Sequence, residues 1–303
     1  MFKRLISVFS AAVLAALLCG CAYTPKNEEK VSVVATIFPI YDFARAVGGD
    51  RIDLKLLIRP GTEVHSYDPR PSDIAAVENS DLFAFIGGES DEWARRLISG
   101  SKRKLNVLEL MKHAKLLTED GEDEYDEHIW TSPANAVSMV DAVCGALCEI
   151  DKENADYYRK NAAEYTDKIR AVREELSAAV ESMPKKYILV ADRFPFKYFA
   201  SEFGLSYSAA FGGCASDTDI SLKTMTRLVN DVKTHGCTAA YYTELSNRQI
   251  ADALAEETGV TLLQLHSAHN VTLDDFNNGI TYIDIMRRNA EVLKGQKNDA
   301  DRG

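Results

Sequence analysis

Short apolar runs alternate with helix-like stretches along most of this chain, which restricts the fold to the α/β class. The run at 31–37, Val-Ser-Val-Val-Ala-Thr-Ile, is short and rich in β-branched residues, so it predicts a buried strand. Because helical stretches follow such runs, we expect mainly parallel sheets covered by helices. The predicted strands are 31–37, 52–58, 82–88, 106–110, 187–191, 238–243 and 260–265. The shorter predicted helices are 41–47, 73–79, 93–99, 134–150, 196–203, 221–234, 248–258 and 274–293.

A long amphipathic segment divides this series in two. Apolar residues recur every three or four positions from Ala155 to Val180, which predicts a helix that ends near Pro184. About 27 residues at 1.5 Å each give a length of roughly 40 Å. We interpret this helix as a spine that joins two α/β lobes, although a surface helix of a single domain would show the same pattern. The predicted parts are an N-terminal lobe at 31–152, a linking helix at 153–184, a C-terminal lobe at 185–296 and a polar tail at 297–303.

The N-terminus has the pattern of a targeting segment. Lys3 and Arg4 precede an apolar run at 5–18 that is short for a membrane span. The run ends in Leu-Cys-Gly-Cys, which resembles a bacterial lipoprotein cleavage box with Cys21 as the lipidated residue. We therefore predict a signal peptide at 1–20, a lipidated tether at 21–30 and a location on the extracytoplasmic face of the cell membrane. An ordinary signal peptide or a short anchor is the alternative.

Charge and cysteine content narrow the possible partners. The formal net charge of −11 argues against nucleic acid, because phosphate binding needs clustered Lys and Arg. The acidic run at 119–124 is typical of a solvated loop, although it could also attract cations. Cys144 and Cys148 lie four positions apart on a predicted helix, as two buried thiols would. Cys214 and Cys237 could pair, but spacing alone does not decide this.

Several polar side chains follow the predicted strands at the point where each strand ends. In parallel α/β sheets, ligands bind beyond these carboxyl ends, so we expect the side chains to converge on a cleft between the lobes. Imidazoles combined with a carboxylate suit zinc, and a set richer in carboxylates shifts toward manganese. The candidates are His65, His128, Asp192, Glu244 and His266.

Each candidate also has a plainer interpretation. Asp192 could cap the helix that follows it, and Glu244 could simply pair with Arg248. A single histidine in a loop is most often solvated. His269 ranks below His266, because it lies three residues further along in a stretch with the character of a helix cap.

Two motifs carry a resemblance to a known family. The stretch Gly-Thr-Glu-Val-His-Ser-Tyr at 61–67 and the stretch Asp-Glu-His-Ile-Trp-Thr-Ser-Pro at 126–133 are similar to the two ligand motifs of cluster A-I substrate-binding proteins. These are the zinc-uptake and manganese-uptake binding proteins of bacterial ABC transporters. The resemblance implies a monomeric protein that captures Zn²⁺, or Mn²⁺ in the alternative, and delivers it to the permease of an ABC importer. It makes His65 and His128 the first two metal ligands.

The second half departs from the family pattern. A gapless match on Phe196 and Tyr198 places Arg193 at the third ligand position, where a guanidinium cannot bind a cation. One inserted residue places Asp192 there, and we prefer this on chemical grounds. The fourth position, normally an Asp, falls on His266, which favours zinc over manganese. The predicted metal ligands are therefore His65, His128, Asp192 and His266.

Catalysis is not expected. The sequence has no His-Glu-x-x-His and no Gly-x-Ser-x-Gly, which disfavours a zinc hydrolase. A surface adhesin with the same fold is the remaining alternative to transport.

Overall fold

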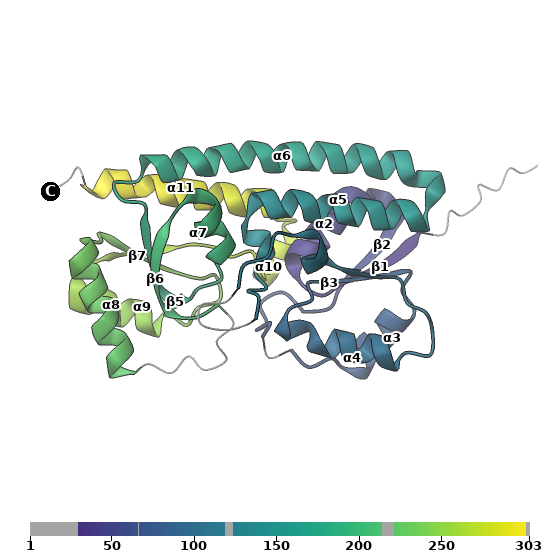
Figure 1. Cartoon of the computed structure of the whole chain (residues 1–303), viewed down its shortest axis with the longest axis horizontal. Coiled ribbons are helices and arrows are strands. Elements are labelled where there is room, and N and C mark those ends of the chain that lie inside the picture. Colours follow the sequence, from purple (N-terminus) through teal and green to yellow (C-terminus); the bar gives the residue numbers. More distant parts are fainter. Residues whose placement is uncertain (1–29, 66, 119–123, 214–220, 301–303) are drawn as a thin grey trace, which may run out of the picture. The chain divides into compact units, whose positions relative to one another are not determined.

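The computed structural model describes residues 30–65, 67–118, 124–213 and 221–300, with side chains up to residue 295. The predicted signal peptide, the lipidated Cys21 and most of the acidic run lie outside the described residues, and so does Cys214. From Val31 onward the chain forms one compact unit that contains two four-stranded sheets (Figure 1).

The first sheet is entirely parallel and has the order β2-β1-β3-β4. Its strands are β1 (Val31–Ala35), β2 (Ile52–Leu56), β3 (Leu82–Phe85) and β4 (Val107–Glu109). Successive residues of β1 belong to two different cores, because side chains alternate across a sheet. Val33 packs into the main core, whereas Val34 packs with Trp93 in a smaller core beneath α3 (Pro71–Glu78) and α4 (Glu92–Gly100). Both faces of the sheet are therefore covered.

The second sheet repeats this arrangement with the order β6-β5-β7-β8, again entirely parallel. Its strands are β5 (Tyr187–Arg193), β6 (Ser206–Phe211), β7 (Ala239–Tyr242) and β8 (Thr261–Gln264). Leu189 packs into a core with α8 (Leu222–His235) and α9 (Gln249–Thr258). Val190 points the other way into the main core, on the side of α7 (Lys197–Phe203).

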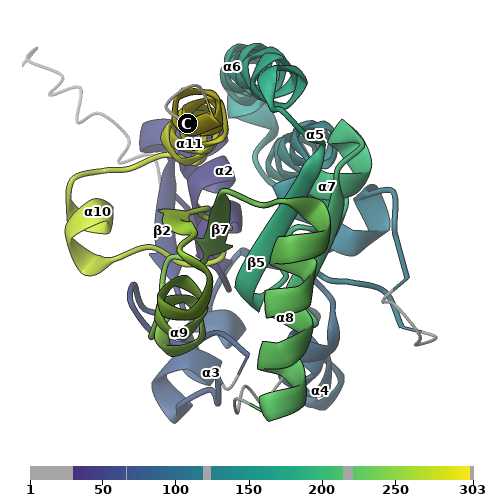
Figure 2. The same cartoon turned by 90° about the vertical axis from the view of Figure 1, so that its left-hand side faces the viewer.

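One long helix, α6 (Ala155–Ser182), runs beside both sheets (Figures 1 and 2). It packs against α5 (Pro133–Ile150), α2 (Phe38–Gly48) and α11 (Tyr282–Ala300). Its apolar face, from Tyr158 to Val180, is buried in a main core shared by the two halves. Among the described helices, α5 is long and apolar enough to span a membrane, but it packs here on other helices. The predicted α/β class with a long backbone helix is confirmed.

Two local predictions were wrong. The sequence pattern did not predict β6, an edge strand whose side chains are mostly only partly buried. It also predicted one closing helix at 274–293, which the structure divides into α10 (Leu273–Asn277) and α11. The chain breaks at Gly279, which adopts a φ of 74°. Thr281 and Asp284 then begin α11 by exchanging side-chain and backbone hydrogen bonds, as a capping box does.

Candidate metal centre

Three histidines from separate loops converge at the carboxyl ends of the strands. The ligand atoms of His65, His128 and His269 all lie within 4.8 Å of one another. Their ring centroids are 5.0 to 5.6 Å apart, and the ring of His269 stands at 81° and 88° to the other two. Rings at such angles can direct their nitrogens to one point between them, as the ligands of a single ion must.

A buried carboxylate orients His65. Nδ1 of His65 lies 3.1 Å from Oγ of Ser90 and 3.3 Å from Oε1 of Glu127. Burial alone would raise the pKa of Glu127, but the hydrogen bond with His65 and the charges of both neighbouring histidines lower it overall. Gly88 makes room for this carboxylate, since a Cβ there would lie 2.2 Å from Oε2 of Glu127. Because Nδ1 is engaged, Nε2 of His65 is the nitrogen left for a metal.

His128 is held in the same way by the residue two positions before it. Oδ1 of Asp126 accepts the backbone N–H of His128 at 2.8 Å and lies 3.2 Å from Nδ1 of its ring. Trp130 packs against both His128 and His269, with ring centroids 5.3 and 4.8 Å apart. Its indole N–H donates to the carbonyl of Ser267, which links this loop to the second half of the chain.

His269 follows a tight turn after β8. Ala268 adopts a φ of 60°, which is uncommon for a residue with a side chain. The two oxygens of Glu244 accept the backbone N–H and the hydroxyl of Ser267 at 2.8 and 2.6 Å, which fixes the turn. Burial, followed by the positive charges of His65, His128 and Arg193, lowers the pKa of His269 well below its usual value. The ring is therefore neutral near pH 7, the form that binds metal.

The structure does not place Asp192 or His266 in this group. Asp192 accepts the hydroxyl of Thr243 at 2.7 Å and so joins the ends of β5 and β7. Nδ1 of His266 accepts the N–H of Ala268 at 2.9 Å, and Asn289 hydrogen-bonds both its backbone N–H and its carbonyl. His266 thus shapes the turn that presents His269. In the sequence, nearness to the strand end favoured His266 over His269. That criterion does not take this turn into account.

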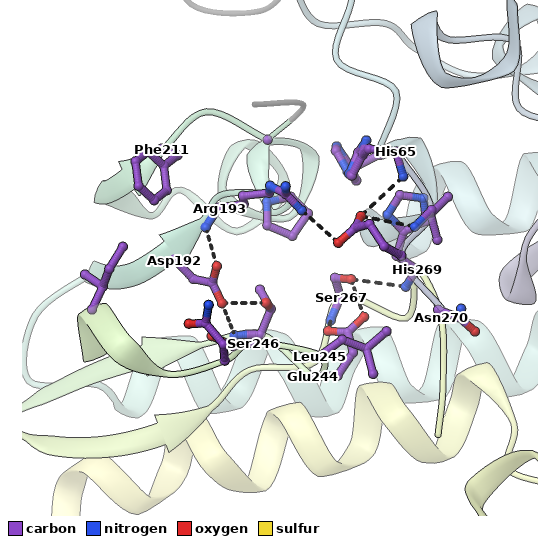
Figure 3. A pocket seen from close by; sticks show the side chains of 18 of the residues that line it. His65, Asp192, Arg193, Phe211, Glu244, Leu245, Ser246, Ser267, His269 and Asn270 are labelled. Carbon is purple, nitrogen blue, oxygen red and sulfur yellow. Dashed lines mark hydrogen bonds and ion pairs between the residues drawn. The ribbon is translucent and has the colours of Figure 1, made fainter. Parts of the chain in front are cut away.

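Arg193 lies at the end of β5 and faces the same cavity as the histidines. Its Nη1 donates to Oε2 of Glu63 at 3.0 Å. Burial alone would raise the pKa of Glu63, but the Arg193 charge and the N–H of His65 lower it overall. The cavity has a volume of about 210 Å³ and is lined by polar groups from both halves of the chain. Figure 3 shows Arg193 reaching across it toward His65.

Comparison with known proteins shows the family of this chain. The sequence profile of the family described as zinc-uptake complex component A, periplasmic, matches residues 33–296. The chain belongs to this family. This family is described as one part of an uptake complex and not as an enzyme. The expectation that the chain is not an enzyme is therefore confirmed.

Two relatives with zinc-related names match most of this chain. The zinc-binding lipoprotein AdcA of Streptococcus pneumoniae is 27% identical, over 95% of this chain and 60% of AdcA. The chain thus spans about 60% of the length of that relative. The high-affinity zinc uptake system protein ZnuA of Bacillus subtilis is also 27% identical, over 97% of this chain and 98% of its own length.

Solved structures of the family share this fold. The Zn(II)-bound ZnuA-like domain of S. pneumoniae AdcA is 27% identical and superposes with a TM-score of 0.78, over 89% of this chain and 99% of that domain. The laminin-binding protein Lmb of Streptococcus agalactiae, described as bifunctional with adhesin and metal-transporting activity, has a TM-score of 0.81 at 27% identity. That comparison covers 89% of this chain and 100% of Lmb.

Proposed function

We propose that this chain is the substrate-binding component of a zinc importer. It captures Zn²⁺ through His65, His128 and His269 and delivers it to an ABC permease. The observation that carries this proposal is the convergence of the three imidazoles, whose ligand atoms lie within 4.8 Å of one another. Buried carboxylates support two of these rings, an arrangement that is common behind zinc-binding histidines. AdcA, which shares the fold, was solved with zinc bound.

The donor set favours zinc over manganese. Imidazole nitrogen suits Zn²⁺, whereas Mn²⁺ prefers sites rich in carboxylate and carbonyl oxygens. The carboxylates of Glu127 and Asp126 contact histidine rings, and that of Glu244 is hydrogen-bonded to Ser267. These oxygens support the ligands and do not join the group around the site.

We further propose that the mature protein is a monomer tethered to the membrane on its extracytoplasmic side. The signal-peptide pattern at 1–20 and the lipoprotein-like sequence ending in Cys21 support this location. AdcA, a relative, is named as a lipoprotein. The predicted lobes at 31–152 and 185–296, joined at 153–184, remain our proposal for the division of the chain.

Isothermal titration of the metal-stripped protein tests the zinc assignment. We expect Zn²⁺ to bind with a Kd of about 1 µM or lower and more tightly than Mn²⁺. His269→Ala should weaken zinc binding by at least an order of magnitude, because one of three nitrogen ligands is lost. His113→Ala is the matched control, since His113 is exposed and lies outside the cluster. Equal zinc affinity in the two variants would exclude His269 as a ligand, and tighter binding of Mn²⁺ would overturn the metal assignment.

A further inference from the structure

Among the described residues, the candidate metal centre offers three histidine ligands. Zinc in proteins usually has four ligands. Within the part of the chain that the structure describes, the group that could hold a metal consists of His65, His128 and His269 and includes no carboxylate or thiolate. The fourth ligand therefore comes from outside this group of histidines.

A cation shares the cavity with these histidines. Arg193 lines the cavity together with the histidines. Nε of Arg193 is buried and has no hydrogen-bond partner among the described residues, while Nη1 donates to Glu63. The guanidinium therefore retains a donor directed away from solvent.

A guanidinium beside a Zn²⁺ site is electrostatically unfavourable by itself, because two positive charges repel at short range. An anion placed between the two cations attracts both of them, so the net electrostatic interaction becomes favourable. A carboxylate suits this position, because one oxygen can coordinate zinc while the other accepts an N–H of the guanidinium. The cavity of about 210 Å³ has room for such an anion beside the ion, since a water molecule occupies about 30 Å³.

We propose that this protein binds zinc together with a small carboxylate anion, which completes the coordination of the metal and is held by Arg193. The inference rests on the proposed binding of zinc by His65, His128 and His269. It deepens that proposal by making the captured species a zinc–carboxylate complex. Arg193 acts as a specificity-determining residue that binds the anion.

Glu63 is the rival source of the carboxylate. It already accepts from Arg193 at 3.0 Å, and its other oxygen accepts the backbone N–H groups of Val64 and His65 at 3.1 and 3.2 Å. Those backbone contacts hold Glu63 on its own loop, and it does not belong to the metal-binding group. If Glu63 moved onto the metal, no external anion would be needed, and the two cases are separable by experiment.

Zinc affinity, measured with acetate as the probe, tests the proposal. The metal-stripped full chain is titrated with zinc over the same range of free-zinc concentrations in acetate-free buffer and in millimolar acetate, with chloride at equal ionic strength as the reference. We expect acetate to lower the zinc Kd by about tenfold, as charge-assisted hydrogen bonds would. In Arg193→Gln, the ratio of the two Kd values should fall toward one. Zinc binding in acetate-free buffer should become tighter in this variant, because the repulsive charge is gone.

The variant Glu63→Gln distinguishes the two carboxylates. If the external anion is the ligand, Glu63→Gln keeps or enlarges the effect of acetate, because Arg193 loses its internal partner. If Glu63 is the ligand, this variant weakens zinc binding in acetate-free buffer and the unaltered protein ignores acetate, which overturns the proposal. An acetate effect of equal size in Arg193→Gln, or a chloride effect as large as that of acetate, also overturns it.

Cobalt provides a readout that a purely structural role of Arg193 would not change. The visible absorption of Co²⁺ bound at this site depends on its ligands, so acetate should shift the spectrum of the unaltered protein and leave that of Arg193→Gln unchanged. An unshifted spectrum in the unaltered protein overturns the proposal. Failure of the proposed function has a different result, because neither Zn²⁺ nor Co²⁺ would then bind in any buffer.

Discussion

At the scale of single residues, the carboxylates behind the histidines organise the site as much as the histidines do. Glu127 contacts Nδ1 of His65 at 3.3 Å, and Asp126 contacts Nδ1 of His128 at 3.2 Å. Such contacts fix the tautomer and the direction of each ring and increase its basicity toward metal. In the sequence these two residues stand directly before His128.

Removing the charge of Glu127 should therefore weaken zinc binding. We expect Glu127→Gln to raise the zinc Kd by about 10- to 100-fold, because the amide keeps the size of the side chain but does not attract the proton on His65. Competition with a chromogenic chelator measures this change. Glu124→Gln is the matched control, since Glu124 is exposed on the same loop. Equal affinities in the two variants would contradict the role given to Glu127.

The lowered pKa of His269 predicts how the stability of the metal-free protein depends on pH. The ring stays neutral in the folded state at a pH at which an unfolded histidine, with a pKa of about 6.5, becomes protonated. The unfolded state then binds more protons, so the free energy of unfolding decreases as the pH falls below about 6.5.

Urea unfolding of the zinc-free protein at pH 7.5 and pH 5.5 measures this effect. His269→Gln should show a smaller loss of stability between these two values of pH, whereas His113→Gln, at an exposed position, should show the full loss. The same loss in both variants would mean that other groups cause the dependence.

At the scale of secondary-structure elements, one buried carboxylate joins three helices. Asp42 of α2 accepts the hydroxyl of Tyr165 in α6 and, at 2.8 Å, the N–H of Tyr282 at the start of α11. It also pairs with Arg45 at 2.5 Å. Because Asp42 lies against the N-terminus of α11, the dipole of that helix favours its negative charge. Asp42 therefore holds the helices that cover both sheets.

Asp42→Ala should destabilise the fold by about 3 kcal/mol, because it leaves buried donors without their acceptor. Chemical denaturation monitored by circular dichroism measures the change in the free energy of unfolding. Asp167→Ala is the control, since Asp167 is exposed on α6 and pairs only with Arg170 in a surface contact. A loss below about 1 kcal/mol for Asp42→Ala would contradict this role.

The elements differ in how well the sequence predicts them. Most strands were predictable from short apolar runs bounded by turn residues, and the long helix from its sustained helical period. Strand β6 was not, because the segment Ser206–Phe211 lies at an edge and is mostly only partly buried, so its pattern is weak. The break before α11 was not predictable either. It occurs at Gly279, whose positive φ is seen only in the folded chain.

The candidate site was only partly predictable for a similar reason. The sequence singled out His65 and His128, which the structure brings together with His269. The choice between His266 and His269 depends on a hydrogen bond from Ala268 to His266 and on the left-handed conformation of Ala268. These features have no signature in residue types or spacing. The gapless match to the family pattern placed Arg193 at the third ligand position, and both Arg193 and Asp192 line that cavity.

At the scale of the whole described unit, the two sheets present their carboxyl ends to one site. His65 and His128 come from the first half and His269 from the second, and Asn270 donates to the carbonyls of Arg59 and Thr62 at 2.9 and 2.8 Å. These hydrogen bonds, with the shared main core along α6, hold the loops of the two halves in place. The proposed zinc site therefore lies between loops that both halves of the chain hold in position.

Anomalous diffraction at the zinc edge from crystals of the zinc-loaded protein tests the central claim most directly. We predict a single anomalous peak within about 2.0 to 2.1 Å of one ring nitrogen each of His65, His128 and His269. A peak bound instead by Asp192 and His266, or one that lacks His269 among its ligands, would contradict the account.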